Sequence, residues 1–177
     1  MSGAARLALV DPETATGAVG QTLEEFRRRG PLGPMVLGMA NSSAVLRGYR
    51  ELNRAMKRSH LDRRVTERIA LAVQEWLGCA YCLAAHTRAA HELGLSEVDI
   101  ELARHGTATD AKIAAIVAFG QQMVAAPAEI SDTDVEHLRE HGYSDEQIAE
   151  VVGLVALQLL TGAFILVAGI EPVEAVG

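Results

Sequence analysis

Signals for the start and the end of helices recur along this chain of 177 residues. Three of the start signals are capping boxes, in which an acidic or amide side chain follows a serine three residues later: Ser96 with Asp99, Ser131 with Asp134, and Ser144 with Gln147. Gly94 and Gly142 each stand two residues before one of these serines, where glycine commonly ends a helix. Asp62 can cap a further helix. Because no long segment alternates with the period of a strand, the sequence predicts an all-α protein.

The predicted helices cover most of the chain. We expect them at about 21–29, 42–58, 62–77, 79–93, 97–105, 110–125, 132–141 and 145–168. A composition with 49% hydrophobic but only 4% aromatic residues suits helices that pack through small and aliphatic side chains. A chain of this length buries enough surface to fold without a disulfide or a structural metal. We therefore expect a single-domain helical bundle over residues 1–177, with a weak leading segment at 1–33, a cysteine-containing core at 62–105 and a second helical half at 110–172.

Residues 151–170 contain no charged side chain over a length that could span a bilayer. Gln158 and Thr161 interrupt the apolar run, acidic residues flank it, and no Lys or Arg lies nearby to set an orientation. We therefore expect no membrane span, but a helix buried on all sides, inside the domain or at an interface between subunits.

Charge is divided unevenly along the chain. Residues 1–90 carry 13 basic and 8 acidic side chains, whereas residues 91–177 carry 3 basic and 15 acidic ones. Basic side chains are densest from Arg47 to Arg68, where we expect solvated helix faces that meet acidic faces within or between subunits. The net charge of −7 and the lack of aromatic residues among the basic ones argue against nucleic-acid binding. No secretory signal is visible in residues 1–30, which favours a cytoplasmic location.

Two pairs of segments resemble each other. Residues 91–100 (HELGLSEVDI) share Gly, Ser and Ile with residues 139–148 (REHGYSDEQI), and residues 68–73 resemble residues 112–117. These matches predict two related helical units, although helices joined by a glycine and a capping serine would also match without a duplication.

The stretch from Glu67 to His86, ERIALAVQEWLGCAYCLAAH, contains the candidate chemistry. Cys79 and Cys82 are three residues apart and His86 follows four residues later, so all three share one face if residues 79–93 are helical. Gly78 predicts a break that places Cys79 in the first turn, where free N–H groups and the helix dipole favour a thiolate. Two cysteines at this spacing in a first turn can also form a disulfide.

The spacing leaves both the acid and the type of chemistry open. Glu67 lies about 18 Å from Cys79 along one continuous helix, and it reaches the cysteines only if the chain folds back after residue 77. Glu75 is an equal candidate by periodicity alone. Two cysteines in a chain without an export signal indicate redox or metal chemistry in a reducing compartment. Haem attachment is excluded because Leu83, and not a histidine, follows the second cysteine. Inert buried cysteines are one further alternative, and a zinc site is another, with the ligands Cys79, Cys82, His86 and His91.

This stretch resembles the core of the alkylhydroperoxidase D-like branch of the carboxymuconolactone decarboxylase family, as found in its peroxidase-related members. The family pattern is Glu, eleven residues, CxxC, three residues and His, and four residues match it: Glu67, Cys79, Cys82 and His86. The segments GPLGPMVLGMANSSAVLRGY, HELGLSEVDI and ISDTDVEHLREHGYSDEQIAEVV are also similar to family sequences, so the resemblance spans about residues 30–172. It implies an all-helical homo-oligomer and a thiol peroxidase that needs no cofactor or metal.

The resemblance also implies the reaction cycle. Cys82 attacks the O–O bond of a small hydroperoxide to give a sulfenic acid, and Cys79 resolves it to a disulfide that an external dithiol or thiol protein reduces. Glu67 and His86 form the proton relay. Helix-end electrostatics alone would instead favour Cys79 as the nucleophile. Tyr81 stands where some members have a second histidine, and a phenol is a poor base at neutral pH.

Because of Tyr81, other hypotheses stay open: a slower peroxidase, a general disulfide reductase, and another chemistry of the family. A further alternative is a non-catalytic helical oligomer with a redox-switch or inert cysteine pair. We expect Met35 and Met39 either at an entrance to the site or in the core, and Trp76 in packing. The remaining histidines are expected at the surface as ordinary polar residues: His60, His91, His105, His137 and His141.

Overall fold

Helices make up most of residues 5–172, the part of the chain that this computed structural model describes, and no strand occurs in it. Residues 1–4 and 173–177, the two ends of the predicted domain, lie outside the described part. The predicted all-α fold is therefore confirmed. The elements in chain order are α1 (Gly17–Arg27), α2 (Pro34–Met39), α3 (Ser43–Met56), α4 (Arg63–Leu77), α5 (Ala80–Glu92), α6 (Glu97–Arg104), α7 (Ala111–Ala125), η1 (Pro127–Glu129), α8 (Asp132–Glu140) and α9 (Asp145–Ala168).

The predicted helix boundaries agree with the structure to within two residues, except at the N-terminal helix, which begins earlier than expected. Two elements were missed, α2 and the 3-10 helix η1. Both begin with a proline, which is favoured in the first turn because its fixed φ suits a helix and its missing N–H is not needed there. In α2 the N-cap is Gly33, which offers no capping side chain.

The capping residues act as the sequence predicts. The carboxylate of Asp62 accepts a hydrogen bond of 2.7 Å from the backbone N–H of Arg64 at the start of α4. The hydroxyl of Ser144 accepts one of 3.2 Å from the third residue of α9. Gly94 and Gly142 have φ values of +79° and +80°, the left-handed conformation that ends a helix without a steric penalty.

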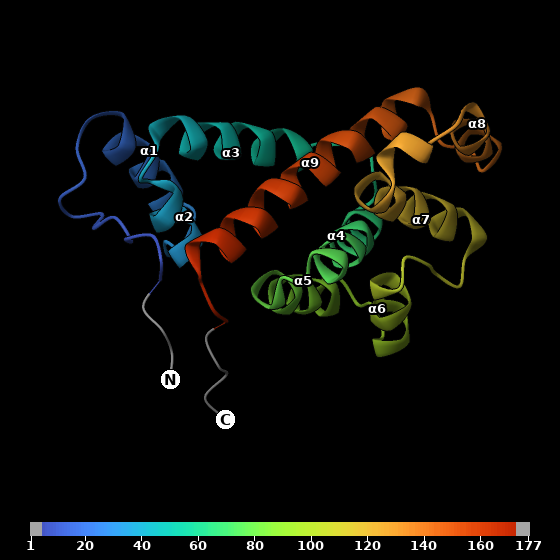
Figure 1. Ribbon diagram of the computed structural model, residues 1–177, viewed down its shortest axis with the longest axis horizontal. Helices are drawn as coiled ribbons and strands as arrows, with labels where there is room; N and C mark the ends of the chain where they lie inside the picture. The colour runs from blue at the N-terminus through green and yellow to red at the C-terminus, as the bar shows by residue number, and fades with distance from the viewer. Residues whose placement is uncertain (1–4, 173–177) are drawn as a thin grey trace.

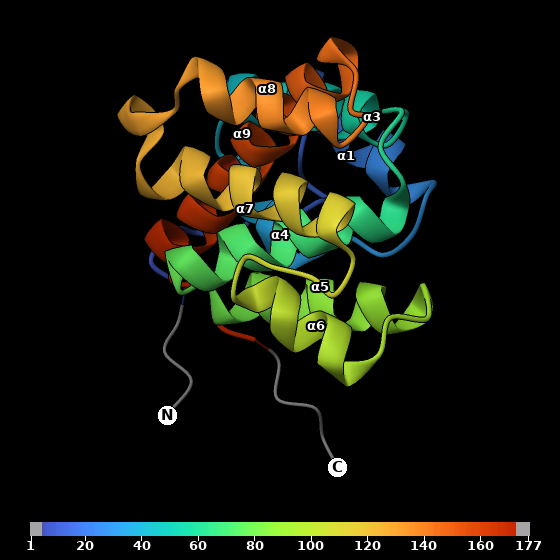
Figure 2. The same cartoon turned by 90° about the vertical axis from the view of Figure 1, so that its right-hand side faces the viewer.

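Helix α4 lies at the centre of the molecule. It packs against α5, α6, α7 and α9, and eight of its fifteen residues are buried. Figure 2 shows α7 and α8 on one side of α4 and α5 and α6 on the other. Helix α9 runs across the molecule from α8 to α2, and α3 lies beside it (Figure 1). The helices α4, α5 and α6 and the helices α7, α8 and α9 form two similar groups, because in each group a glycine and a capping serine precede the third helix. That the two groups arose by duplication stays a prediction.

The uncharged segment lies in α9, the one described helix that is long and apolar enough to cross a membrane, and half of its most apolar window is buried in the fold. The prediction of a helix buried on all sides within the domain is wrong, because the neighbouring helices cover only one face. Its other face exposes between 37% and 62% of four large side chains: Val152, Leu159, Leu166 and Val167. Burial of this face between subunits stays a prediction.

Candidate active site

The turn between α4 and α5 determines where the cysteines lie. Gly78 has φ +68° and ends α4 in the left-handed conformation. The backbone N–H of Cys79 then donates to the carbonyl of Gln74 at 3.1 Å, so the chain reverses within a few residues. Helix α5 runs back beside α4, which is the folding back that Glu67 needs in order to approach the motif on α5.

The two sulfur atoms lie side by side at the start of α5. Cys79 is the N-cap of this helix and not, as predicted, a residue of its first turn. Its Sγ accepts a hydrogen bond of 3.4 Å from the backbone N–H of Cys82, and the two Sγ atoms are 2.6 Å apart. Both cysteines are free thiols. Because a disulfide bond measures about 2.05 Å, little movement would be needed to close one here.

The two thiols share their protons. The hydrogen bond with Cys82 lowers the pKa of Cys79 from 9.0 to about 7. Burial opposes this shift, whereas the backbone N–H of Cys82 and the charge of His86 support it. The pKa of Cys82 is raised, because its hydrogen bond with Cys79 and its burial both disfavour a second thiolate. The pair therefore releases one proton readily and retains the other.

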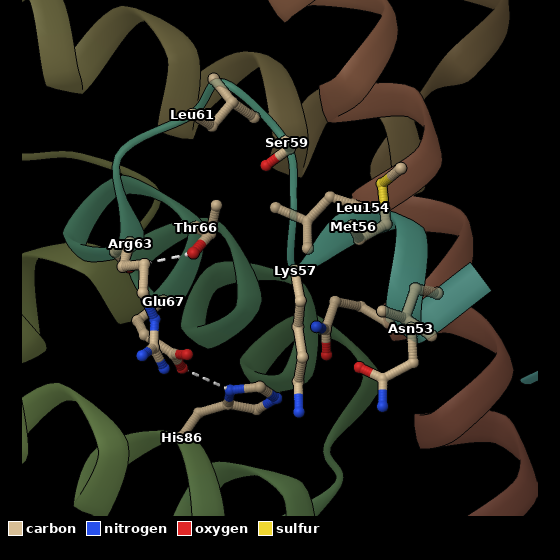
Figure 3. Close-up of a pocket in the computed structure, with 12 residues that line it drawn as sticks. Asn53, Met56, Lys57, Ser59, Leu61, Arg63, Thr66, Glu67, His86 and Leu154 are labelled. Carbon is tan, nitrogen blue, oxygen red and sulfur yellow. Dashed lines mark hydrogen bonds and ion pairs between the residues drawn. The ribbon is translucent and has the colours of Figure 1, made fainter. Parts of the chain in front are cut away.

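Glu67 and His86 form a hydrogen-bonded pair across the two helices. Oε2 of Glu67 on α4 lies 2.7 Å from Nδ1 of His86 on α5 (Figure 3). Both side chains are largely buried, at 14% and 23% exposure. Glu75, the equal candidate by periodicity, instead binds Nε of Arg104 on α6 at 2.7 Å. The tertiary structure therefore selects Glu67 as the carboxylate that orients the imidazole.

Cys82 and His86 open onto one cavity of about 160 Å³, here called the sulfur cavity, whose lining includes Met35, Tyr49, Tyr81, Cys82, His86 and Thr161. Cys82 is 5% exposed and Cys79 is 0% exposed, so a small molecule in this cavity would contact Cys82 and not Cys79. Among the described residues, His86 makes no direct hydrogen bond to either sulfur. Proton exchange between them would therefore pass through a molecule in the cavity.

Two phenols face the sulfur cavity. Burial raises the pKa of Tyr49, and the nearby Tyr81 raises it further. Burial raises the pKa of Tyr81, and negative charge on the nearby cysteine pair raises it further, whereas the charge of Arg88 opposes the shift. Both side chains therefore keep their protons at neutral pH and can donate a hydrogen bond. Of the two predicted methionines, Met35 lines the cavity, whereas Met39 is fully buried in the core.

A second cavity of about 200 Å³ adjoins the first and is here called the cationic cavity. Its lining includes Asn53, Lys57, Arg63, Glu67, His86 and Leu154 (Figure 3). Four residues line both cavities: Asn53, His86, Leu157 and Gln158. The side-chain oxygen Oε1 of Gln158 accepts a hydrogen bond of 2.9 Å from the buried side-chain amide of Gln74, which holds the Gln158 side chain between α4 and α9.

The contributions of α3 and α9 to these cavities were not predicted from the sequence. Tyr49 and Asn53 are four residues apart on α3 and therefore share one face of the helix, which could have been predicted from their spacing. Gln158 is a polar residue within an apolar segment, and a buried amide at such a position usually has a specific partner. Neither signal shows that these helices approach α5.

The other candidates lie outside the site. The ligands of the predicted zinc alternative do not converge, because His91 is exposed and contacts Glu97 at 3.3 Å. In residues 5–172, the metal-binding side chains that do converge are His60, Glu146 and Glu150 at the surface. His60, His105 and His137 are exposed as expected, and His141 is half-buried. Trp76, which was expected in packing, is 51% exposed.

Solved structures share this fold. An uncharacterized peroxidase-related protein from Ralstonia eutropha JMP134, with an alkylhydroperoxidase AhpD core, is 20% identical over 98% of this chain and 95% of its own, with a TM-score of 0.83. A protein of unknown function from Agrobacterium tumefaciens, with a suggested role in antioxidant defence, is 25% identical over 76% of this chain and 94% of its own, with a TM-score of 0.67. The debrominase Bmp8 is 17% identical over 89% of this chain and 86% of its own, with a TM-score of 0.71.

A family model matches the part of the chain that holds the motif. The match covers residues 43–125, from α3 to α7, and is to the carboxymuconolactone decarboxylase family. No curated protein matches the sequence. Residues 43–125, just under half of the chain, are therefore similar to the carboxymuconolactone decarboxylase family, and the chain has the all-helical fold of the alkylhydroperoxidase AhpD core.

Proposed function

We propose that this protein is a thiol peroxidase that reduces small organic hydroperoxides with Cys82 and Cys79 and without a cofactor. One observation supports this most directly. The sulfur atoms of Cys79 and Cys82 are free and lie 2.6 Å apart, and Cys82 lines a cavity that is also lined by His86. The same fold occurs in a debrominase, so the proposal rests on this site and not on the fold.

In the first step, a hydroperoxide enters the sulfur cavity and meets Cys82. The cysteine pair carries one negative charge near neutral pH, which its hydrogen bond favours on Cys79. When the peroxide binds, a proton passes from Cys82 to Cys79 across the 2.6 Å between the sulfurs, so that Cys82 becomes the thiolate. The thiolate attacks the terminal peroxide oxygen and the O–O bond breaks. Cys82 becomes a sulfenic acid, and the released alkoxide takes a proton to leave as an alcohol. Cys82 is preferred to Cys79 as the nucleophile because it is the one that lines the cavity.

In the second step, Cys79 resolves the sulfenic acid. The Sγ of Cys79 attacks the Sγ of Cys82, an S–S bond forms, and hydroxide leaves with a proton as water. An external dithiol then reduces the disulfide and is itself oxidised, which returns both thiols. A reducing compartment such as the cytoplasm would supply that reductant.

Glu67 and His86 serve the proton transfers in both steps. The carboxylate of Glu67 holds Nδ1 of His86, so that the second ring nitrogen is free to exchange a proton in the cavity. Tyr81 keeps its proton at neutral pH and can donate a hydrogen bond to the departing oxygen, although it cannot serve as a base.

The test is peroxide consumption by the reduced protein in the presence of a dithiol, followed by thiol counting and peptide mapping. We expect turnover and a Cys79–Cys82 disulfide. Cys82→Ser should abolish the loss of free thiol, whereas Cys79→Ser should leave a sulfenic acid that dimedone traps. Slow, substoichiometric oxidation without turnover would support a redox switch and contradict the proposal, as would trapping at Cys79 in the Cys82→Ser variant.

A further inference from the structure

We infer that the cationic cavity binds a carboxylate on the substrate, so that the preferred substrates are small hydroperoxides that carry a negative charge. This inference rests on the proposed peroxidase function and adds the substrate class. It is carried by the charges around the cavity, by the direction of one lysine side chain, and by the residues that the two cavities share.

The lining of the cationic cavity has an excess of positive charge. Lys57 and Arg63 contribute one cation each, and within residues 5–172 neither forms an ion pair. The one carboxylate in the lining belongs to Glu67, which is already bound to the imidazole of His86 at 2.7 Å. Two unpaired cations beside a single paired carboxylate attract an anion into this cavity.

The hydrogen-bond donors converge at the end of the cavity near the imidazole. Figure 3 shows the side chain of Lys57 extending along the cavity, with its ammonium group toward His86 and the amide of Asn53 at the same end. One N–H of the Asn53 amide donates to the hydroxyl of Tyr49 at 3.3 Å, which leaves its second N–H for a ligand. An ammonium and an amide N–H are suitable donors for a carboxylate, whereas an uncharged alkyl chain would satisfy neither.

The two cavities are placed to share one ligand. Asn53, His86 and Gln158 are among the residues that line both of them. A molecule whose peroxide lies at Cys82 can therefore extend past His86 and place its other end beside Lys57. The two cavities, of about 160 Å³ and 200 Å³, together lie at the low end of the roughly 300–1,000 Å³ of a pocket for a drug-sized ligand, so the substrate is a small molecule.

The experiment compares one hydroperoxide with and without its charge. The probe is isocaproic acid with a hydroperoxide on its tertiary carbon, and the reference is the methyl ester of the same compound; homologues with longer acyl chains test the reach between the cavities. For the wild type we expect kcat/KM to be about tenfold higher for the acid than for the ester, the effect of one charged hydrogen bond at a partly exposed site. In Lys57→Met this preference should fall to about one.

Arg58→Met is the matched control, because it removes the same charge from the adjacent exposed residue, which does not line the cavity. It should retain the preference for the acid, and Arg63→Met should reduce it in part. Equal turnover of acid and ester at every chain length would overturn the carboxylate site and leave the peroxidase proposal intact. So would a Lys57→Met variant that slows both compounds alike. If neither compound is turned over by the wild type, the proposed function itself fails, and the inference fails with it.

Discussion

Replacing Cys82 by alanine should make Cys79 a much weaker acid. The hydrogen bond with Cys82 is the largest cause of the lowered pKa of Cys79, which falls from 9.0 to about 7. A change of about two pKa units corresponds to about 2.7 kcal/mol at 1.36 kcal/mol per unit. In Cys82→Ala the pKa of Cys79 should therefore return toward 9, and the fraction of thiolate at pH 7 should fall from about one half to about one in a hundred.

The assay is the ultraviolet absorbance of the thiolate, followed against pH in the fully reduced protein. Cys82→Ser should give an intermediate midpoint, because its hydroxyl still donates a hydrogen bond to the thiolate. His86→Ala should shift the midpoint less than Cys82→Ala, because the charge of His86 is a smaller cause. A midpoint that stays near 7 in Cys82→Ala would refute the reasoning, and it would assign the acidity to the end of the helix alone.

The same pKa values predict how stability depends on pH. A thiol whose pKa is lower in the folded protein stabilises it most above the pKa of the unfolded thiol, and this contribution is lost as the pH falls through about 7. The free energy of unfolding of the reduced wild type should therefore rise from about pH 7 toward pH 8.5, by at most about 2.7 kcal/mol. Above that pH the free energy of unfolding should decline. The pKa of Cys82 is raised in the folded protein, so the folded state stays protonated at Cys82 while the unfolded chain loses that proton. Urea denaturation of the wild type and of Cys82→Ala measures the difference.

Further outcomes follow from the acids and from two glycines. Glu67→Gln removes the carboxylate that orients the imidazole of His86, and under the proposed function kcat/KM for a hydroperoxide should fall about 100-fold. Glu75→Gln is the matched control and should stay within about twofold of the wild type, since Glu75 pairs with an arginine outside the site. Gly162→Ala would place a Cβ 2.5 Å from Oε1 of Gln74, and denaturation should show a loss of about 1–3 kcal/mol. Gly48→Ala, in a helix with open space around it, should instead gain about 0.5–1 kcal/mol. If Gly162→Ala is as stable as the wild type, the close packing at Gly162 is contradicted. If the two glutamate variants lose activity equally, the role of Glu67 at the imidazole is contradicted.

Local signals were sufficient for most of the helices. A capping serine, an aspartate or a glycine acts within one turn of the backbone, so the ends of α4 to α9 could be predicted from neighbouring residues. The exceptions have local reasons as well. Helix α2 starts at Pro34 after a glycine that cannot cap with a side chain, and its start was therefore overlooked.

The sequence by itself determined which side chains of the motif lie together, because helix geometry places residues three and four positions apart on one face. Cys79, Cys82 and His86 could therefore be grouped without coordinates. Tertiary structure alone decided the partners that lie far away in sequence. It placed Glu67 and not Glu75 on the imidazole, brought α3 and α9 to the sulfurs, and left one face of α9 uncovered. The physical reason is that helical periodicity defines the direction of a side chain around its own axis, whereas the neighbour it meets depends on how separate helices pack.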